Sequence, residues 1–342
     1  MHSPLLLIRT LLLLLLCTAT VSAAVRVDFE LVTDKGLSSA ATQQWFKTMT
    51  DLGVSGLRIR RAEPADVPKI DQVGTKEVPA YRVVGVVDAR GTLQLPGQRF
   101  TQRDAAGITR WIAELNNNGV VGVTEKKAAY GLTHEQLESV ITDLKRPVDF
   151  STKGLKPSEI ASRIARGLKI PTTVEVNAKK AIAAGEPIQQ ELKGLSSGTV
   201  LAAILRANGA TLNPQKPDGQ PVRYYVTSGT AESDTWPIGW PPEDPPAKFI
   251  PKLFEFLNAE IDGVTAAEAL EALEGRLEVP MLLDHAQLAK HKIDLKKTIS
   301  IPAKKTYYSK VLQQVLFQVD LKNDVRVDEN GKPLFWITTI KK

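Results

Sequence analysis

Hydrophobic positions in residues 25–123 switch between the two-residue period of a strand and the longer period of a helix. Val27, Phe29 and Leu31 alternate with polar residues, which predicts a half-buried strand. Large apolar side chains then recur at helical spacing, at Trp45, Phe46, Met49 and Leu52. A hairpin turning at residues 88–91 and a helix that starts near residue 101 and stops at residues 116–119 are expected next. These patterns predict an N-terminal α+β domain over residues 24–125.

Thr133 and Gln136 have the spacing of a capping box, in which each side chain satisfies a backbone N–H group of the other residue. The helix that they open is expected to reach about Leu144. We therefore predict a connecting helix within residues 126–146, between the N-terminal domain and the rest of the chain.

Residues 154–171 and residues 263–280 align without a gap and share one hydrophobic pattern. A glycine begins each stretch and a proline ends it. The apolar residues of each stretch fall on one face of a helix. Each helix is expected to be followed by an apolar strand, which continues through Val176 in the first copy and covers residues 281–283 in the second. So long a match indicates a duplicated unit.

The duplication continues downstream of these two helices. Each copy is expected to contain a strand, a helix and a second strand. In the first copy these lie at residues 188–192, 200–205 and 210–213, and in the second at residues 298–301, 311–316 and 321–327. An Asp-Gly or Asn-Gly hairpin turn then leads to a final strand. The chain is therefore predicted to hold two tandem domains built from β-α-β units, over residues 147–228 and residues 251–342.

A proline-rich linker over residues 229–250 separates the copies and contains Trp236 and Trp240. Proline at this density favours an extended backbone. Two interpretations of these tryptophans are open: they dock into the seam between the copies, or they form an exposed aromatic site for a partner. Tyr307 and Trp336 each belong to a pair of adjacent aromatic residues. They are further candidates for partner contact, because alternation along a strand buries one member of a pair and exposes the other.

The duplicated unit resembles the short N-terminal domains of secretins and TonB-dependent receptors. The resemblance is carried by residues 153–170, 193–205 and 262–283, in which a glycine and an apolar residue precede an amphipathic helix. Those domains are small periplasmic modules that bind other proteins and carry no catalytic residues. The resemblance implies an α+β fold of small mixed sheets with helices on one face, and a contact or scaffold role with an envelope protein as partner.

The first residues have the pattern of an export signal. Arg9 precedes an apolar run at residues 11–16, and small residues precede a cleavage site after Ala23. This run is shorter than the ~20 apolar residues of a membrane span. We therefore expect export to the periplasm or the medium, with an uncleaved signal as the one route to membrane association. Cys17, the single cysteine, leaves with the signal, so the mature chain is expected to have no thiol chemistry.

The net charge of the chain and its distribution limit the classes of partner that are expected. The formal net charge of +6 is spread over short basic clusters instead of a continuous stripe, which argues against nucleic acid as a partner. Together with the tryptophans and tyrosines, the positive charge leaves a cell-wall glycan or another polymer as an alternative to a protein partner.

Motifs that would define an enzyme are missing from the sequence, which has neither a G-x-S-x-G elbow nor a phosphate-binding loop. His285 and His291, with Asp284 and Asp294 nearby, are the one cluster that could form a metal site, but the spacing of the histidines does not place them on one helical face. Ser196 is expected to cap the helix that follows it. We expect no metal, no cofactor and no catalytic residue. The favoured function is a non-enzymatic interaction or scaffold module of the cell envelope, with a polymer binder or an enzyme of unrecognised type as alternatives.

Overall fold

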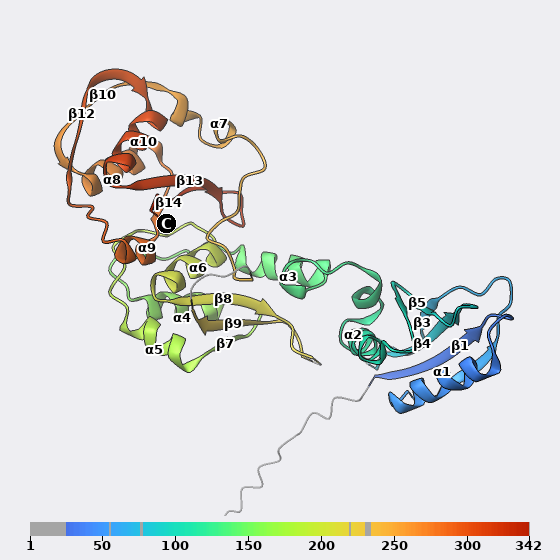
Figure 1. The fold of residues 1–342 in the computed structure, drawn as a ribbon. Coiled ribbons are helices and arrows are strands. Elements are labelled where there is room, and N and C mark those ends of the chain that lie inside the picture. Colours follow the sequence, from blue (N-terminus) through green and yellow to red (C-terminus); the bar gives the residue numbers. More distant parts are fainter. Residues whose placement is uncertain (1–24, 55, 76–77, 219, 230–233, 342) are drawn as a thin grey trace, which may run out of the picture. The chain divides into compact units, whose positions relative to one another are not determined.

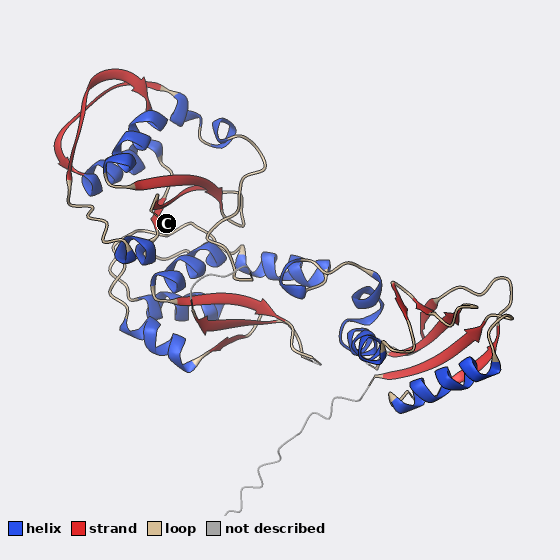
Figure 2. Cartoon of the chain, in the orientation of Figure 1, coloured by secondary structure: helices blue, strands red, loops and turns tan. Residues whose placement is uncertain are grey.

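The computed structural model describes residues 25–341 except residues 55, 76–77, 219 and 230–233, so the expected export signal lies outside the described residues. The chain divides into two compact units, Met1–Thr124 and Glu125–Lys342, which we call unit 1 and unit 2 (Figure 1). Helices and strands are mixed throughout both units, and the sheets are small (Figure 2). Among the described residues, no helix is both long enough and apolar enough to cross a membrane.

Unit 1 is built around one mixed sheet in the order β2-β1-β4-β5-β6, with β3 paired to β4. Its strands are β1 (Arg26–Thr33), β2 (Arg58–Arg61), β3 (Lys69–Gln72), β4 (Ala80–Val87), β5 (Leu93–Leu95) and β6 (Gln98–Phe100). Strand β1 is parallel to both β2 and β4, because the helix α1 (Ser39–Asp51) crosses over between β1 and β2. The predicted hairpin between β4 and β5 is confirmed, with the Gly91 N–H donating to the Asp88 carbonyl at 2.9 Å.

Two tryptophans anchor the core of unit 1. Trp45 of α1 and Trp111 of α2 (Ala105–Thr124) are almost completely buried with the strand residue Phe29. Phe46 is half exposed, so it does not belong to the buried face of the first helix, to which its spacing had assigned it. The helix predicted to stop at residues 116–119 is interrupted there, because Gly119 has a φ of 65°. Further helical residues follow this break, and α2 ends at Thr124.

Unit 2 begins with η1 (Ala129–Gly131) and α3 (His134–Leu144), and the predicted Thr133–Gln136 capping box is present. Helix α3 is an integral part of this unit, because Val140 and Leu144 are fully buried in its core. The Asp143 carboxylate strengthens the attachment. It accepts the backbone N–H groups of Lys169 and Ile170 at 2.8 and 3.0 Å and the Tyr224 hydroxyl at 3.1 Å.

The first half of unit 2 carries a three-stranded sheet in the order β7-β9-β8, in which β7 is parallel and β8 antiparallel to β9. Its elements are α4 (Pro157–Gly167), β7 (Thr172–Val174), α5 (Val176–Ala184), α6 (Ser197–Ala207), β8 (Ala210–Gln215) and β9 (Arg223–Ser228). The amphipathic pattern explains α4, whose Ile160 and Ile164 are buried, and Pro157 occupies its first turn, where the missing N–H costs nothing.

The second half of unit 2 has the same sheet order and sense, β11-β14-β13, with β11 parallel and β13 antiparallel to β14. Its elements are α7 (Pro246–Phe249), η2 (Pro251–Phe254), β10 (Phe256–Thr265), α8 (Ala266–Leu277), β11 (Met281–Leu283), α9 (His285–Lys290), β12 (Thr298–Tyr307), α10 (Tyr308–Gln318), β13 (Leu321–Val327) and β14 (Pro333–Thr339). Strands β10 and β12 form a separate two-stranded antiparallel sheet, here called the ribbon (Figure 1).

Three local expectations for unit 2 are wrong. Val176 begins α5 instead of continuing a strand, and both it and Val174 are exposed, so their alternation did not reflect burial. Residues 188–192 form no strand. Their backbone is bound irregularly by residues 152–155: the Ile188 N–H donates to the Leu155 carbonyl at 2.9 Å and the Leu192 N–H to the Thr152 hydroxyl at 2.7 Å. Ser196 stands at the N-cap of α6, but its side chain caps nothing there.

Candidate functional site

The linker between the two halves of unit 2 fastens their sheets together. The backbone N–H of Trp236 donates to the backbone carbonyl of Leu212 on β8 at 2.7 Å. Trp240 and Val327 of β13 exchange two backbone hydrogen bonds, at 2.7 and 2.9 Å. Because β8 and β13 are edge strands of their sheets, the linker adds backbone to both edges. We call residues 236–240 the strap.

Trp236 lies in the seam between the halves, which is the first of the two interpretations that the sequence left open. It is 3% exposed and stacks on Tyr130, with 5.6 Å between ring centroids. Trp240 packs edge-on against it at 5.4 Å. The Trp236 indole N–H donates to the Glu329 carboxylate at 2.6 Å. The side chain of Trp236 is therefore used inside the molecule.

Glu329 is a buried carboxylate that holds the seam from the opposite side. Besides the indole, it accepts the hydroxyl and the backbone N–H of Thr199 in α6, at 2.9 and 3.3 Å. Burial raises the pKa of the Glu329 carboxyl, although these hydrogen bonds oppose the shift. A methyl group on Gly198 would lie 2.7 Å from the indole nitrogen and closer still to Glu329, so glycine is required there.

The hairpin turn of the second half docks on the start of α6 in the first half. The Ser196 N–H donates to the Asp328 carboxylate at 2.9 Å, and the Asn330 amide donates to the Ser196 hydroxyl at 3.0 Å. The Lys332 ammonium reaches the Gly194 carbonyl at 3.3 Å. The Ser196 hydroxyl thus accepts a hydrogen bond from across the seam and makes no capping bond within α6.

A second polar contact across the seam joins Arg206 of α6 to Asp284, which is 2% exposed. The guanidinium donates to both carboxylate oxygens, at 3.2 and 3.1 Å. Asp284 also accepts the Gln287 N–H and the Thr338 hydroxyl. This aspartate, weighed with His285 as a metal ligand, thus serves an ion pair and a helix cap. No group of metal-binding side chains occurs among the described residues.

Trp336 also lies in the seam. It is 5% exposed, with the Arg326 guanidinium 5.6 Å from its ring centre, and it contributes to the core of the first half. A cavity of about 290 Å³ remains between α6, β8, the strap and these two side chains. Three of the four residues considered for partner contact, Trp236, Trp240 and Trp336, therefore lie together at the seam.

Tyr307, the fourth candidate residue, lies on the ribbon and is exposed. Its ring packs on that of Phe256, with 4.2 Å between centroids, and Phe256 is 60% exposed. The Lys305 ammonium lies 5.2 Å from the centre of the Phe256 ring. Sequence reasoning missed Phe256 because only the pairing register of β10 and β12 places it opposite Tyr307.

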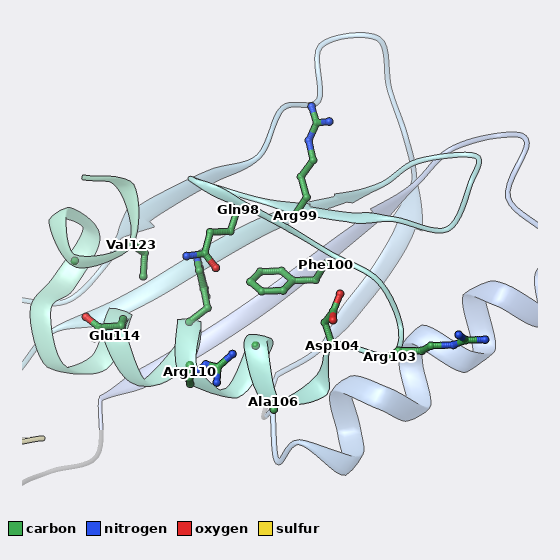
Figure 3. A pocket seen from close by; sticks show the side chains of 12 residues that line it. Gln98, Arg99, Phe100, Arg103, Asp104, Ala106, Arg110, Glu114 and Val123 are labelled. Carbon is green, nitrogen blue, oxygen red and sulfur yellow. The ribbon is translucent and has the colours of Figure 1, made fainter. Parts of the chain in front are cut away.

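A pocket of about 510 Å³ lies in unit 1 between β6 and α2 (Figure 3). Arg99, Arg103 and Arg110 contribute to its lining, and the Asp104 carboxylate accepts the N–H and hydroxyl of Thr101. Its twelve lining residues include no serine, cysteine, histidine, lysine or tyrosine, and Asp104 and Glu114 are its only acidic groups. Figure 3 shows Arg99 and Arg103 pointing away from the hollow.

Comparisons with models of protein families, with curated protein sequences and with solved structures find no match to this chain.

Proposed function

We propose that this chain is an exported, non-enzymatic protein-interaction module of the cell envelope. The observation that carries the proposal is the exposed aromatic pair of Phe256 and Tyr307, with Lys305 beside it, on the ribbon. Aromatic residues next to a cation are the composition of interface hot spots, because they bury a large area at a low cost in side-chain entropy.

The ribbon offers its face to a partner instead of its edges. Strand β12 carries Pro302, which lacks an N–H group, followed by Lys304 and Lys305, and β10 has two register shifts. Proline, lysine and bulges are the devices that protect edge strands from uncontrolled pairing. A partner therefore contacts the aromatic and basic side chains, and the positive charge favours an acidic partner surface.

The proposal includes a tandem arrangement, in which the two halves of unit 2 are copies of one module of the secretin and TonB short-domain type. The identical order and sense of the sheets β7-β9-β8 and β11-β14-β13 support it. The matching glycines Gly154 and Gly263 both have positive φ, at 81° and 68°. The resemblance and the expected export signal both support a location in the periplasm or the medium as part of this proposal.

A photo-crosslinking experiment tests the proposal. A photoreactive phenylalanine analogue replaces Phe256, and the matched control carries it at Phe46, which is half exposed on α1. In envelope extract of the source cells, position 256 is expected to give discrete protein adducts that position 46 does not give. Lys304→Glu with Lys305→Glu should reduce these adducts at least fivefold. Equal adducts at both positions, or none at position 256, would overturn the proposal.

The polymer alternative has its own measurement. Because Trp236 is buried at the seam, that alternative rests on Tyr307, Phe256 and the lysines of the ribbon. We expect no sedimentation of the purified protein with cell-wall material. Sedimentation that Tyr307→Ala abolished would favour the polymer and count against a protein partner.

A further inference from the structure

A groove of about 390 Å³ lies between α10 and the outer edge of β13. Its lining is mostly apolar and includes Leu253, Leu312, Leu316, Phe317, Leu321 and Ile340. Phe317 is 69% exposed and Ile340 is 43% exposed, so large apolar side chains face water here. An exposed apolar hollow beside a strand edge is unusual, because both features promote association.

The backbone of β13 is open along this groove. In an antiparallel strand, every second residue directs both its N–H and its C=O outward. Val327 uses both groups on the outer edge to bind Trp240, so Val325 and Asn323 direct theirs outward as well. Among the described residues, no backbone hydrogen bond reaches these two from that side. Pro241 and Pro242 follow Trp240 and have no N–H groups, which explains why the linker does not continue the pairing.

The corresponding position in the first half of unit 2 is filled by the strap. Leu212 pairs with Val226 in β9, and Asn323 pairs with Ile337 in β14, so both pairs are related by the same shift of 111 residues. The Leu212 carbonyl accepts the N–H of Trp236. The residue that corresponds to Leu212 in the second half is Asn323, 111 positions later, and its carbonyl also points outward from the sheet.

The helices correspond in the same way. The Trp236 indole lies against Gly198 of α6, and the residue 111 positions later, Ser309 of α10, lines the open groove. Trp236 and Ile238 are both buried, at 3% and 5% exposure, on their side of the molecule. One half therefore shows how an extended aromatic-Pro-apolar segment docks between a helix and a strand edge. The other half presents the corresponding helix and strand edge at an open groove, which Pro246, Leu253 and Phe254 also line.

We propose that the groove between α10 and β13 binds an extended segment of a partner protein, with a tryptophan or similar aromatic residue and an apolar residue two positions later. The segment adds to the edge of β13 by backbone hydrogen bonds, as in strand addition, while its aromatic side chain enters the groove. The outward N–H and C=O groups select a peptide over a lipid or a small apolar ligand. A second copy of this chain does not supply the segment, because its own Trp236 is buried. This inference rests on the proposed interaction function and names the class of segment that is recognised.

A labelled peptide with the sequence of residues 234–239, Asp-Thr-Trp-Pro-Ile-Gly, serves as the probe for fluorescence anisotropy with the full mature chain. Saturable binding is expected, and a peptide with glycine in place of tryptophan should bind at least tenfold more weakly. Phe317→Asp places a negative charge in the groove and Gln313→Trp fills it with a large side chain, and each should weaken binding at least tenfold. Phe46→Asp, the same change at an exposed phenylalanine on α1, should leave binding unchanged.

Amide hydrogen exchange supplies the structural readout. The peptide should slow exchange at Asn323 and Val325, whose N–H groups face outward, and leave Lys322 and Asp324 unchanged because their N–H groups already face β14. Absence of saturable binding, or binding that Phe317→Asp does not weaken, would overturn the inference. Phe256 lies on the ribbon and does not line this groove, so adducts at position 256 without peptide binding would leave the proposed function standing and remove only the groove.

Discussion

Single residues at the seam combine burial with full hydrogen bonding. The Glu329 carboxylate is buried but accepts three hydrogen bonds, from Trp236 and twice from Thr199. Burial raises the pKa of its carboxyl, and the nearby Asp328 carboxylate acts in the same direction. A carboxyl whose folded pKa lies above its unfolded value binds protons more tightly when folded. Its contribution to stability is therefore complete below the unfolded pKa and is lost as the pH rises through the folded pKa.

The predicted result is a pH effect on melting. Above about pH 4.5, the ordinary value for glutamate, the unfolding free energy of unit 2 should fall as the pH rises, and Glu329→Gln should make this decline shallower. Melting temperatures from circular dichroism between pH 4.5 and 7.5 provide the measurement. Glu260→Gln, an exposed change on β10, is the matched control and should keep the wild-type slope. Identical slopes for Glu329→Gln and wild type would contradict the assignment.

The strap is the element that joins the two sheets of unit 2. Pro237 within the strap, and Pro241 and Pro242 directly after it, favour an extended backbone and have no N–H groups, so backbone pairing is confined to Trp236 and Trp240. The aromatic stack of Tyr130, Trp236 and Trp240 then buries this short segment. Prolines that limit hydrogen bonding and tryptophans that supply burial explain how the strap is ordered without regular secondary structure.

Truncation of the strap should therefore destabilise unit 2. Trp236→Ala is expected to lower its unfolding free energy by about 3–5 kcal/mol, the usual cost of removing a buried tryptophan side chain. Trp236→Phe keeps most of the apolar contact and loses the hydrogen bond to Glu329, so a smaller loss of about 1.5–3 kcal/mol is expected. Urea denaturation followed by circular dichroism measures both. Phe46→Ala on α1 serves as the exposed control, and equal losses for Trp236→Ala and Phe46→Ala would refute the role of the strap.

At the scale of the whole molecule, the distribution of cores decides which parts can fold alone. Unit 1 has its own core around Phe29, Trp45 and Trp111. The core of the first half of unit 2 includes Leu334 and Trp336 from the second half, and the Arg206–Asp284 ion pair also crosses the seam. The two halves of unit 2 are therefore expected to unfold together.

Fragments make this expectation measurable. Residues 25–124 and residues 125–342 should each give a cooperative thermal transition. Residues 125–228 should not, because that fragment leaves Arg206 without its partner and opens the core where Trp336 packs. Circular dichroism melting and proton NMR dispersion compare the three. A cooperative transition in residues 125–228 with the stability of residues 125–342 would show that the seam is dispensable.

Much of the local structure could be predicted from the sequence. The capping box at Thr133, the amphipathic helices α4 and α8 and the hairpin at residues 88–91 depend on neighbouring residues alone, and all are present. Alternation misled at Val176, because β7 ends at Val174, Val176 begins α5, and both valines are exposed, so the pattern carried no information about burial. Element type was therefore predictable wherever a long amphipathic period accompanied a capping or turn signal.

The sequence by itself determined that helices and strands alternate along this chain and that two stretches share one pattern, because periodicity and turn chemistry act over a few residues. Only the tertiary structure decided that Trp236 meets Glu329, that Arg206 meets Asp284 and that Phe256 lies beside Tyr307. These partners are separated by tens of residues, and the packing of sheets and the register of strands bring them together. The open edge of β13 is likewise a property of the arrangement, because it depends on where the linker stops pairing.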